Sequence, residues 1–280
     1  EHVPVSHLAF GAAERALKDA MVDPLEVDLI IMGTVTPDMS MPSTACIVQQ
    51  KLGADRAAAF DISAACSGFL YAMKIAKRLI SDGAYSNAVI IGAEKLSSVT
   101  NWEDRNTCVL FGDGAGAAVL RRSNDGEGRI LATEMGTDGR HTSLLEIKGG
   151  GSACPITAAN AESNLQTLSM QGREVFKLAV NAMRTAAETV IERAGLTPED
   201  IKLIVPHQAN LRIIDAIADR LSVPNDKVYI NLNKYGNTSA AAVAIALDEA
   251  HREGRFERGD NIILVVFGAG LTWAATAIEW

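Results

Sequence analysis

The chain has 280 residues, of which 48% are hydrophobic and 21% charged, so it can bury a large core in one domain or in two fused ones. Its net charge of −8 argues against nucleic acid or anionic membrane as a general partner. The four cysteines are widely spaced and the five histidines lack metal-ligand spacing, which argues against a disulfide framework or a metal site. No apolar run reaches the roughly 18 residues of a membrane span, and we expect a cytoplasmic protein.

The first half of the chain alternates helical and strand patterns. Predicted helices carry apolar residues at helical spacing, and predicted strands are short apolar runs. We expect helices over 5–21, 43–52 and 68–81, and strands over 28–34, 57–62, 88–92 and 130–134. The block FGDGAGAAVL at 111–120 predicts a glycine-rich turn that leads into a further strand.

Periodicity fades between residues 136 and 169, which we expect to form a connecting loop with a glycine-rich stretch at 149–151. A loop of this length is either functional or mobile. Beyond it the alternation returns. We expect helices over 172–194, 211–221 and 238–253, and strands over 201–205, 228–232, 261–267 and 272–279.

The two halves resemble each other at an offset of roughly 170 residues, as duplicated units with variable loops would. DLIIMG is matched by KLIVPH, and VLFGDGAGAAVL by VVFGAGLTWAAT. We therefore predict an α/β fold made of two duplicated halves, each a mixed sheet with helices on its faces. The expected division is 1–135 for the N-terminal half, 136–169 for the connecting segment and 170–280 for the C-terminal half.

Cys66 follows a predicted strand and precedes a predicted helix, in the stretch AAAFDISAACSGF. The unpaired N–H groups of a helix start favour thiolate and could later hold an oxyanion. This placement predicts a nucleophile. The alternative is a buried structural cysteine, because free cysteine is among the most buried residue types.

The duplication would bring the carboxyl ends of strands from both halves toward one another, where α/β sheets bind ligands. His207 and Asn237 lie at such ends and could share a pocket with Cys66. Alternatively, His207 bonds only to backbone and Asn237 is only a turn or cap residue. A cysteine peptidase would also use these three residue types, but the duplicated α/β order and the absence of papain-like signatures argue against it.

Four blocks in order, DISAACSGF, VPHQANLRII, YGNTSAA and FGAGLTW, together with FGDGAGAAVL and DRNT, resemble the signatures of the 3-oxoacyl-[acyl-carrier-protein] synthase III family in the thiolase superfamily. The resemblance covers essentially the whole chain. It implies a five-layer αβαβα fold, a homodimer and an acyltransferase that needs no cofactor. Such an enzyme condenses an acyl-CoA primer with malonyl-acyl carrier protein and so initiates fatty acid synthesis.

The resemblance also assigns roles to residues. Cys66 would be the acyl-accepting nucleophile, and His207 and Asn237 would assist decarboxylation of the malonyl donor. The oxyanion would lie on N–H groups of Cys66 and of the turn at 268–270. The other implied sites are Gly268, Ala269, Phe267 and Met41 for the oxyanion or acyl pocket, Arg105 and Asn210 for CoA, and Lys177, Arg212 and Arg220 for the acidic carrier protein. Those three basic residues have ordinary solvated charge as their alternative.

The chain departs from the family pattern in several places. Compared with that pattern, we expect the sequence given to begin after the family's first strand and CoA-gripping Trp/Arg segment, and the segment 148–163 to be longer than usual. Met41 stands where the family often has phenylalanine, a residue expected to reach into the partner's acyl pocket. Two other functions stay open: a secondary-metabolite ketosynthase or acyltransferase of the same superfamily, and a truncated non-catalytic subunit.

Overall fold

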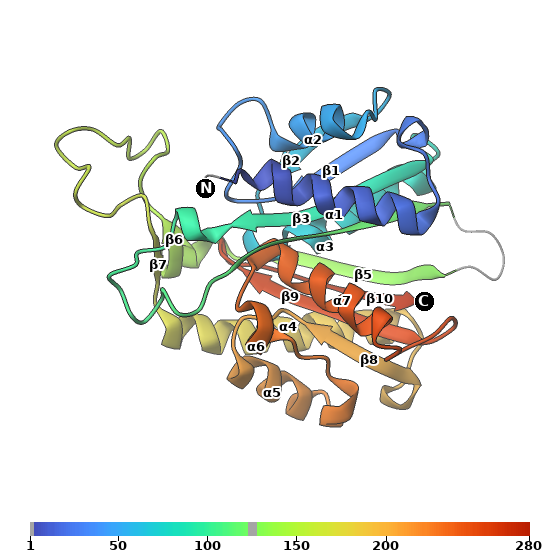
Figure 1. The fold of residues 1–280 in the computed structure, drawn as a ribbon. Coiled ribbons are helices and arrows are strands. Elements are labelled where there is room, and N and C mark those ends of the chain that lie inside the picture. Colours follow the sequence, from blue (N-terminus) through green and yellow to red (C-terminus); the bar gives the residue numbers. More distant parts are fainter. Residues whose placement is uncertain (1–2, 123–127) are drawn as a thin grey trace.

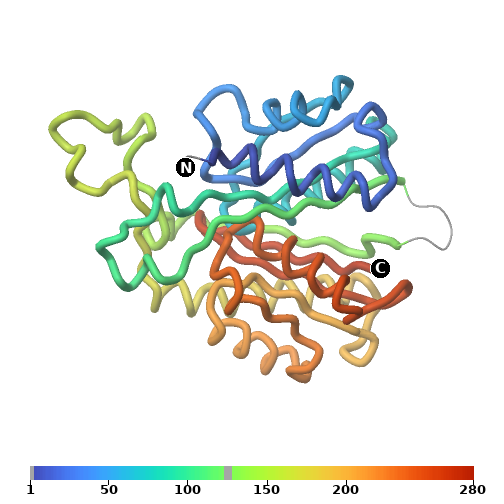
Figure 2. Tube along the Cα trace, in the orientation of Figure 1, coloured from blue at the N-terminus to red at the C-terminus, as the bar shows by residue number. Residues whose placement is uncertain are grey.

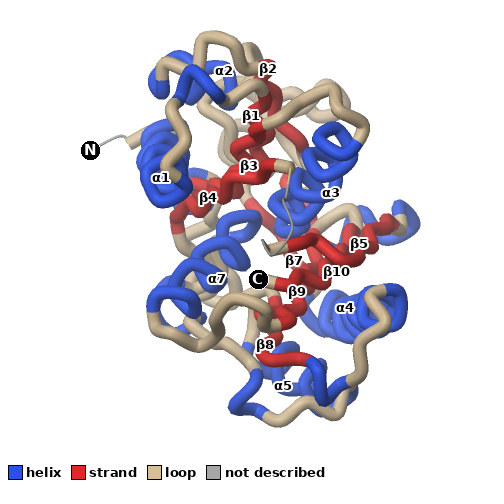
Figure 3. The backbone as a smooth tube through the Cα atoms, turned by 90° about the vertical axis from the view of Figure 1, so that its right-hand side faces the viewer, coloured by secondary structure: helices blue, strands red, loops and turns tan. Residues whose placement is uncertain are grey.

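Five layers, helices alternating with sheets, make up the body of the protein (Figures 1 and 3). This computed structural model describes residues 3–122 and 128–280. Within those residues, two four-stranded sheets lie between three layers of helices, and a third, two-stranded sheet stands beside them. The five-layer αβαβα arrangement implied by the family resemblance is confirmed, as is the α/β class predicted from the duplication.

The first sheet comes from the N-terminal half. Its strands, in spatial order, are β2 (Ala58–Ile62), β1 (Leu29–Gly33), β3 (Asn87–Lys95) and β4 (Asp113–Arg121). β1 pairs in parallel with β2 and β3, whereas β3 and β4 are antiparallel. All five residues of β1 are buried, as expected for a strand covered on both faces. The helices on the outer face are α1 (Val5–Ala20) and α2 (Thr44–Leu52).

The second sheet comes mainly from the C-terminal half. Its strands, in spatial order, are β5 (Arg129–Thr137), β10 (Thr272–Glu279), β9 (Asn261–Gly268) and β8 (Ile201–Pro206). Its outer face carries α4 (Gly172–Arg193) and α5 (Leu211–Arg220). The central layer between the sheets holds α3 (Gly68–Ser81) and α7 (Ala242–Arg252) (Figure 3). Each half thus supplies one central helix, as a duplication requires.

One predicted strand is absent. Residues 228–232 form only a single bridge between Val228 and Ile204, and the chain then turns into α6 (Leu232–Tyr235). The physical reason is local, because the Gln208 side chain accepts hydrogen bonds from the N–H groups of Asn231 and Leu232. Those groups are no longer available to a strand ladder, and the backbone turns toward the cavity described below.

β5 crosses between the halves. It pairs along its length with β10, although the expected division assigns most of it to the N-terminal half at 1–135. The connecting segment 136–169 also has structure: a 3₁₀ helix (Gly139–Leu144) and the hairpin of β6 (Leu145–Ile147) with β7 (Leu168–Met170). Three-residue strands are too short to give a periodic signal. The stretch between them projects from the body (Figure 2).

Glycine contacts fix where the central helix begins. A Cβ placed on Gly33, the last residue of β1, would lie 2.6 Å from the carbonyl carbon of Gly68. Only two glycines permit this approach between a strand end and a helix start. Phe69 and Leu70 then enter the core between the sheets, with 1% of each exposed. The packing therefore holds the turn that carries Cys66 directly above the end of β1.

Candidate active site

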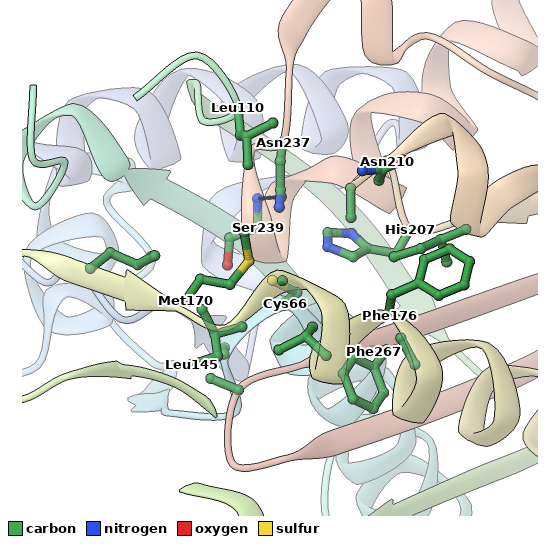
Figure 4. Close-up of a pocket in the computed structure, with 18 of the residues that line it drawn as sticks. Cys66, Leu110, Leu145, Met170, Phe176, His207, Asn210, Asn237, Ser239 and Phe267 are labelled. Atoms are coloured by element: carbon green, nitrogen blue, oxygen red, sulfur yellow. Dashed lines mark hydrogen bonds between the residues drawn. The ribbon is translucent and has the colours of Figure 1, made fainter. Parts of the chain in front are cut away.

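A cavity of about 940 Å³ opens between the two halves and is lined by Cys66, His207 and Asn237 (Figure 4). The three side chains come from three different segments, and Figure 4 shows them directed toward a common space. The structure thus brings together the trio proposed from the sequence. Much of the remaining lining is apolar: Leu110, Leu145, Ile147, Leu168, Met170 and Phe176.

Cys66 lies in a single 3₁₀ turn (Ala65–Ser67) that runs into α3. Its neighbour Ala65 has φ 46°, a left-handed conformation that L-residues seldom adopt. Thr272 holds this turn, since its Oγ1 lies 3.0 Å from both the carbonyl oxygen of Ala64 and Oγ of Ser67. Sharp, strained turns of this kind are typical of functional sites, where they expose one side chain.

The Cys66 thiol is protonated in the open pocket. Burial raises its pKa to about 12, while the nearby Ser239 side chain acts in the opposite direction. The sequence led us to expect that the helix start would favour thiolate, and that expectation is wrong for this state. Desolvation of the charged form outweighs the N–H groups of a single turn. A base must therefore take the thiol proton when Cys66 reacts.

His207 follows β8, and its backbone N–H bonds to the carbonyl oxygen of Val265 at 2.8 Å. The residue is only 3% exposed. Burial lowers the pKa of the imidazole to about 4, so the ring is neutral at physiological pH. Nδ1 is buried and has no hydrogen-bond partner among the described residues. A neutral imidazole can donate one hydrogen bond to a substrate oxygen.

Asn237 is fixed through both its backbone and its side chain. Its N–H donates to the carbonyl oxygen of Leu110 at 2.8 Å, and its own carbonyl accepts from Gly112 at 3.0 Å. Oδ1 accepts a 2.9 Å hydrogen bond from the N–H of Ser239. The turn-residue interpretation and the catalytic one are therefore compatible, because the side chain stabilises the turn with its oxygen and still lines the cavity.

Two polar residues beside the trio were not found from the sequence. Ser239 lies in the Asn237 turn and lines the cavity, and its Oγ is 3.2 Å from Oε1 of Glu94. Glu94 is 0% exposed, in the part of β3 that extends beyond the predicted strand. A signal existed: Glu94 is a charged residue at the end of a strongly apolar run, AVIIGAE.

Gln208 also went unnoticed, although it sits beside His207. Its side chain is 1% exposed and makes four hydrogen bonds. Nε2 donates to the carbonyl oxygens of Pro206 and Tyr229, and Oε1 accepts from Asn231 and Leu232. Gln208 therefore ties the strand end that bears His207 to the segment that leads into Asn237.

The other residues proposed from the sequence are distributed over the cavity and its surroundings. Phe267 and Ala269 line it, and a Cβ on Gly268 would lie 2.7 Å from the Cys66 nitrogen, so this turn touches the nucleophile's backbone. Met41 is 84% exposed and is not part of the lining. Arg105 is exposed and does not line the cavity, although the next residue, Asn106, does.

Three of the residues proposed to contact CoA or the carrier protein, Asn210, Lys177 and Arg220, form hydrogen bonds or ion pairs with neighbouring residues of this chain. Asn210 caps α5 by accepting a hydrogen bond from the Arg212 N–H at 2.9 Å, and both residues line the cavity. Lys177 also lines it and pairs with Glu174 at 3.1 Å. Arg220, at the end of α5, donates to Asn181 at 3.3 Å and lies outside the lining.

Within residues 3–122 and 128–280, no cluster of three or more His, Cys, Asp or Glu side chains could hold a metal ion. No helix among the described residues is long and apolar enough to cross a membrane. The site combines a half-buried cysteine, a neutral histidine and an oriented amide around one largely apolar cavity. On a duplicated α/β fold, these groups are those of an acyl-transfer site of the thiolase type.

Comparison with known proteins agrees with this class. Residues 60–139 match the family model for 3-oxoacyl-[acyl-carrier-protein (ACP)] synthase III, and residues 191–280 match the model for its C-terminal part. A beta-ketoacyl-[acyl-carrier-protein] synthase III of Caldanaerobacter subterraneus subsp. tengcongensis is 58% identical over 275 residues, which cover 98% of this chain and 83% of the relative. One from Clostridioides difficile is 50% identical over 280 residues, 100% of this chain and 85% of the relative.

A solved structure agrees as well. The crystal structure of 3-oxoacyl-[acyl-carrier-protein] synthase III from Aquifex aeolicus VF5 superposes with a TM-score of 0.91 at 48% identity, covering 100% of this chain and 86% of that one. The chain belongs to the 3-oxoacyl-[acyl-carrier-protein] synthase III family, and its five layers are the thiolase fold.

Proposed function

We propose that this chain is an acyltransferase that condenses an acyl-CoA primer with malonyl-acyl carrier protein, with loss of CO₂, to give the 3-oxoacyl-acyl carrier protein that starts fatty acid synthesis. The observation that carries the proposal is the meeting of Cys66, His207 and Asn237 in one cavity. The family of the chain supports the same reaction. The proposed chemistry needs no cofactor, since acyl-CoA is consumed as a substrate.

The first half-reaction loads the enzyme. Cys66 Sγ attacks the thioester carbonyl of acyl-CoA, the carbon–sulfur bond to CoA breaks, and an acyl-Cys66 thioester forms. The backbone N–H groups of Cys66 and Ala269 are our candidates for holding the oxyanion, because the turn at Gly268 packs against the Cys66 nitrogen. The acyl chain would enter the apolar part of the cavity, beside Leu145 and Met170.

The second half-reaction uses the two neutral donors. When malonyl-acyl carrier protein replaces CoA, His207 and the Asn237 amide would bind the oxygen of its thioester. Loss of CO₂ leaves an enolate whose negative charge lies on that oxygen. Donors placed at such a charge each raise the reaction rate by about 10²–10³-fold. The carbanion carbon attacks the acyl-Cys66 carbonyl, the carbon–sulfur bond breaks, and the released thiolate regains a proton.

Charge around the opening supports acidic partners. Three basic residues, Arg173, Lys177 and Arg212, line the cavity of a chain whose net charge is −8. Such a local basic patch would attract the phosphates of CoA and an acidic carrier protein. We propose Arg105 and Asn210 as CoA contacts, and Lys177, Arg212 and Arg220 as carrier-protein contacts.

We further propose a homodimer in the cytoplasm. Among the described residues, no strand pairs with the outer edge of β2, where Phe60 is 36% exposed. Asp61 of β2 accepts a 2.6 Å hydrogen bond from the Thr44 N–H, so the loop that carries Met41 ends beside this edge. In a dimer formed at this edge, Met41 of one subunit would enter the cavity of the other.

We expect Met41→Phe to change the preference for acyl length. Rates measured across acyl-CoA chain lengths for the variant and for wild type test this, and identical rate profiles would contradict it.

The proposal is tested by intact-protein mass spectrometry after incubation with acetyl-CoA and, separately, with longer acyl-CoAs. We expect a gain of one acyl group that is absent in Cys66→Ala, followed by loss of that group when malonyl-acyl carrier protein is added. The donor that loads fastest defines the primer. No mass gain with any donor would overturn the proposal.

A further inference from the structure

The decarboxylation step proposed above needs His207 and Asn237 at a fixed spacing, because both would bind the same thioester oxygen. His207 follows β8, whereas Asn237 lies just beyond α6. Donors that are oriented in advance stabilise a developing charge better than donors that must first move. The fold must therefore hold two separate segments against each other, and the side chains that do so lie outside the cavity lining.

The first of these side chains is Gln208, the residue next to His207. Its Oε1 accepts a 3.0 Å hydrogen bond from the Asn231 N–H, which fixes the backbone of Asn231 to the end of β8. The Asn231 side chain continues to α7, where its Nδ2 donates to Oε2 of Glu249 at 2.7 Å. Asn231 is only 2% exposed, so its amide depends on Glu249 for an acceptor.

Glu249 gathers four donors from one short stretch of the chain. Oε2 accepts from the Asn231 amide at 2.7 Å and from the Tyr229 hydroxyl at 3.4 Å. Oε1 accepts from the Tyr235 hydroxyl at 2.8 Å and from the Lys234 ammonium at 3.1 Å. A carboxylate offers about four acceptor positions, so this one side chain satisfies all four donors.

These donors lie on or beside α6, a helix too short to hold its own position. It has four residues, whereas an isolated helix needs roughly 12–15 to be stable in water. Its neighbour α7 is anchored in the central layer, where Ala246 and Ala250 are fully buried (Figure 1). Only Gly236 separates Tyr235 from Asn237. Contacts that fix α6 to α7 therefore also fix the start of the Asn237 turn.

We propose that Glu249 is a positioning residue for decarboxylation: by holding α6 on the anchored α7, it keeps the Asn237 amide at its spacing from His207. The inference rests on the proposed acyl-transfer function. The backbone bonds of Asn237 with Leu110 and Gly112 link it to the N-terminal half and not to His207. The link to His207 runs through the Glu249 contacts.

The same contacts predict which half-reaction depends on Glu249. Thr272 of β10 holds the turn that carries Cys66, with its Oγ1 3.0 Å from the carbonyl oxygen that begins this turn. His207 keeps its own backbone bond to β9 at 2.8 Å. Loss of the Glu249 contacts should therefore displace Asn237 and leave the loading groups in place.

The first experiment compares Glu249→Gln with wild type. Glutamine keeps the shape of the side chain but has one acceptor oxygen in place of two. Because a displacement of about 1 Å can cost as much as 10²-fold, we expect CO₂ release from malonyl-acyl carrier protein by the acetyl-loaded enzyme to fall about 10–10²-fold. Single-turnover acylation of Cys66 by acetyl-CoA should change less than about twofold.

Asp248→Asn is the matched control. This neighbouring carboxylate of α7 is exposed and pairs with Arg252 at 2.9 Å, four residues further along the same helix. Exposed ion pairs of this kind contribute little, so both rates should stay within about twofold of wild type. An equal fall in CO₂ release in Asp248→Asn and Glu249→Gln would contradict the assignment of the effect to the α6 contacts.

A compensating substitution separates positioning from a general loss of stability. Asn231→Asp reverses donor and acceptor: combined with Glu249→Gln, the introduced amide can donate to the introduced carboxylate. We expect this double variant to recover CO₂ release to within about threefold of wild type. Asn231→Asp alone places two carboxylates together and should be at least as slow as Glu249→Gln. A double variant no faster than either single variant would overturn the inference.

Amide hydrogen exchange without substrate tests the same contacts independently of the reaction. We expect residues 231–237 to exchange about tenfold faster in Glu249→Gln and at the wild-type rate in the double variant, with β1 unchanged in both. A general loss of stability would accelerate β1 as well. Unchanged exchange in 231–237 would overturn the inference, as would equal losses of loading and decarboxylation. If wild type releases no CO₂, the proposed function fails, and the exchange rates still decide for or against Glu249.

Discussion

The N–H of Ser239 donates a 2.9 Å hydrogen bond to the side-chain oxygen of Asn237. With Oδ1 engaged in this way, the amide N–H₂ of Asn237 is the group left for the cavity. The backbone is fixed as well, through paired hydrogen bonds with Leu110 and Gly112. The donor is therefore oriented before any substrate arrives, which is the condition under which such groups stabilise developing charge most effectively.

Replacing Asn237 by aspartate tests this orientation. One carboxylate oxygen of Asn237→Asp can still accept from Ser239, but the other presents negative charge where the enolate forms. We expect decarboxylation of malonyl-acyl carrier protein to fall about 10²–10³-fold while acylation of Cys66 continues. Release of CO₂ and intact mass report the two steps separately. Decarboxylation at the wild-type rate would show that this amide does not bind the enolate.

A second prediction concerns Gln208, whose four hydrogen bonds join the His207 and Asn237 segments. Gln208→Glu keeps the acceptor for Asn231 and Leu232 but leaves two buried carbonyl groups without donors. We expect a loss of about 2–4 kcal/mol in the free energy of unfolding, measured by urea denaturation. Gln50→Glu, on the exposed face of α2, is the control and should change stability by less than about 0.5 kcal/mol.

The sequence predicted the elements that depend on long apolar patterns and the residues that lie in its motif blocks. Cys66, His207 and Asn237 each follow a strand or turn signal, and the duplication indicated that strand ends would meet. The segment 228–232 was misassigned because the side chain of Gln208, distant in the sequence but adjacent in the fold, accepts hydrogen bonds from its N–H groups. No local pattern reports such a contact, since the competition between Gln208 and a strand ladder exists only after folding.

The protonation state of Cys66 could not be predicted for a different reason. A helix start favours thiolate, whereas burial favours the thiol, and only the structure gives the depth of burial that decides between them. Ser239 and Glu94 were missed because the hydrogen bond between them joins residues 145 positions apart. Neither spacing nor composition indicates such a contact.

Two of the buried titratable groups, His207 and Glu94, should give opposite pH dependence of stability. The pKa of His207 is lowered to about 4 from about 6.5 when unfolded, so its neutral burial costs stability as the pH falls from 7 to 5. The pKa of Glu94 is raised to about 7, so the folded state binds its proton more tightly and gains stability over the same range. Each contribution is about 2 kcal/mol.

Single variants should reveal each contribution. On going from pH 7 to pH 5, His207→Gln should gain free energy of unfolding relative to wild type, and Glu94→Gln should lose it. Urea denaturation at the two pH values measures both differences. If both variants follow the wild-type pH dependence, neither group is buried as the structure shows.

The last prediction concerns the contact that holds Ser239 over Glu94. A Cβ placed on Gly92 of β3 would lie 2.1 Å from the carbonyl oxygen of Ala240, and backbone on both sides leaves nothing flexible to move. We expect Gly92→Ala to push the 3₁₀ turn at Ser239–Ala241 away from β3, costing about 3 kcal/mol of stability or more and slowing loading of Cys66.

Gly11 in α1 is the matched control, because no atom lies within 4 Å of a Cβ added there. Gly11→Ala should raise stability by about 0.5–1 kcal/mol, since alanine favours the helix, and leave loading unchanged. Thermal unfolding and single-turnover acylation measure the pair. The two substitutions add the same methyl group. If Gly92→Ala lowers the stability and Gly11→Ala raises it, the loss is due to the contact between β3 and the Ser239 turn. Wild-type loading in Gly92→Ala would mean that this close approach does not position Ser239.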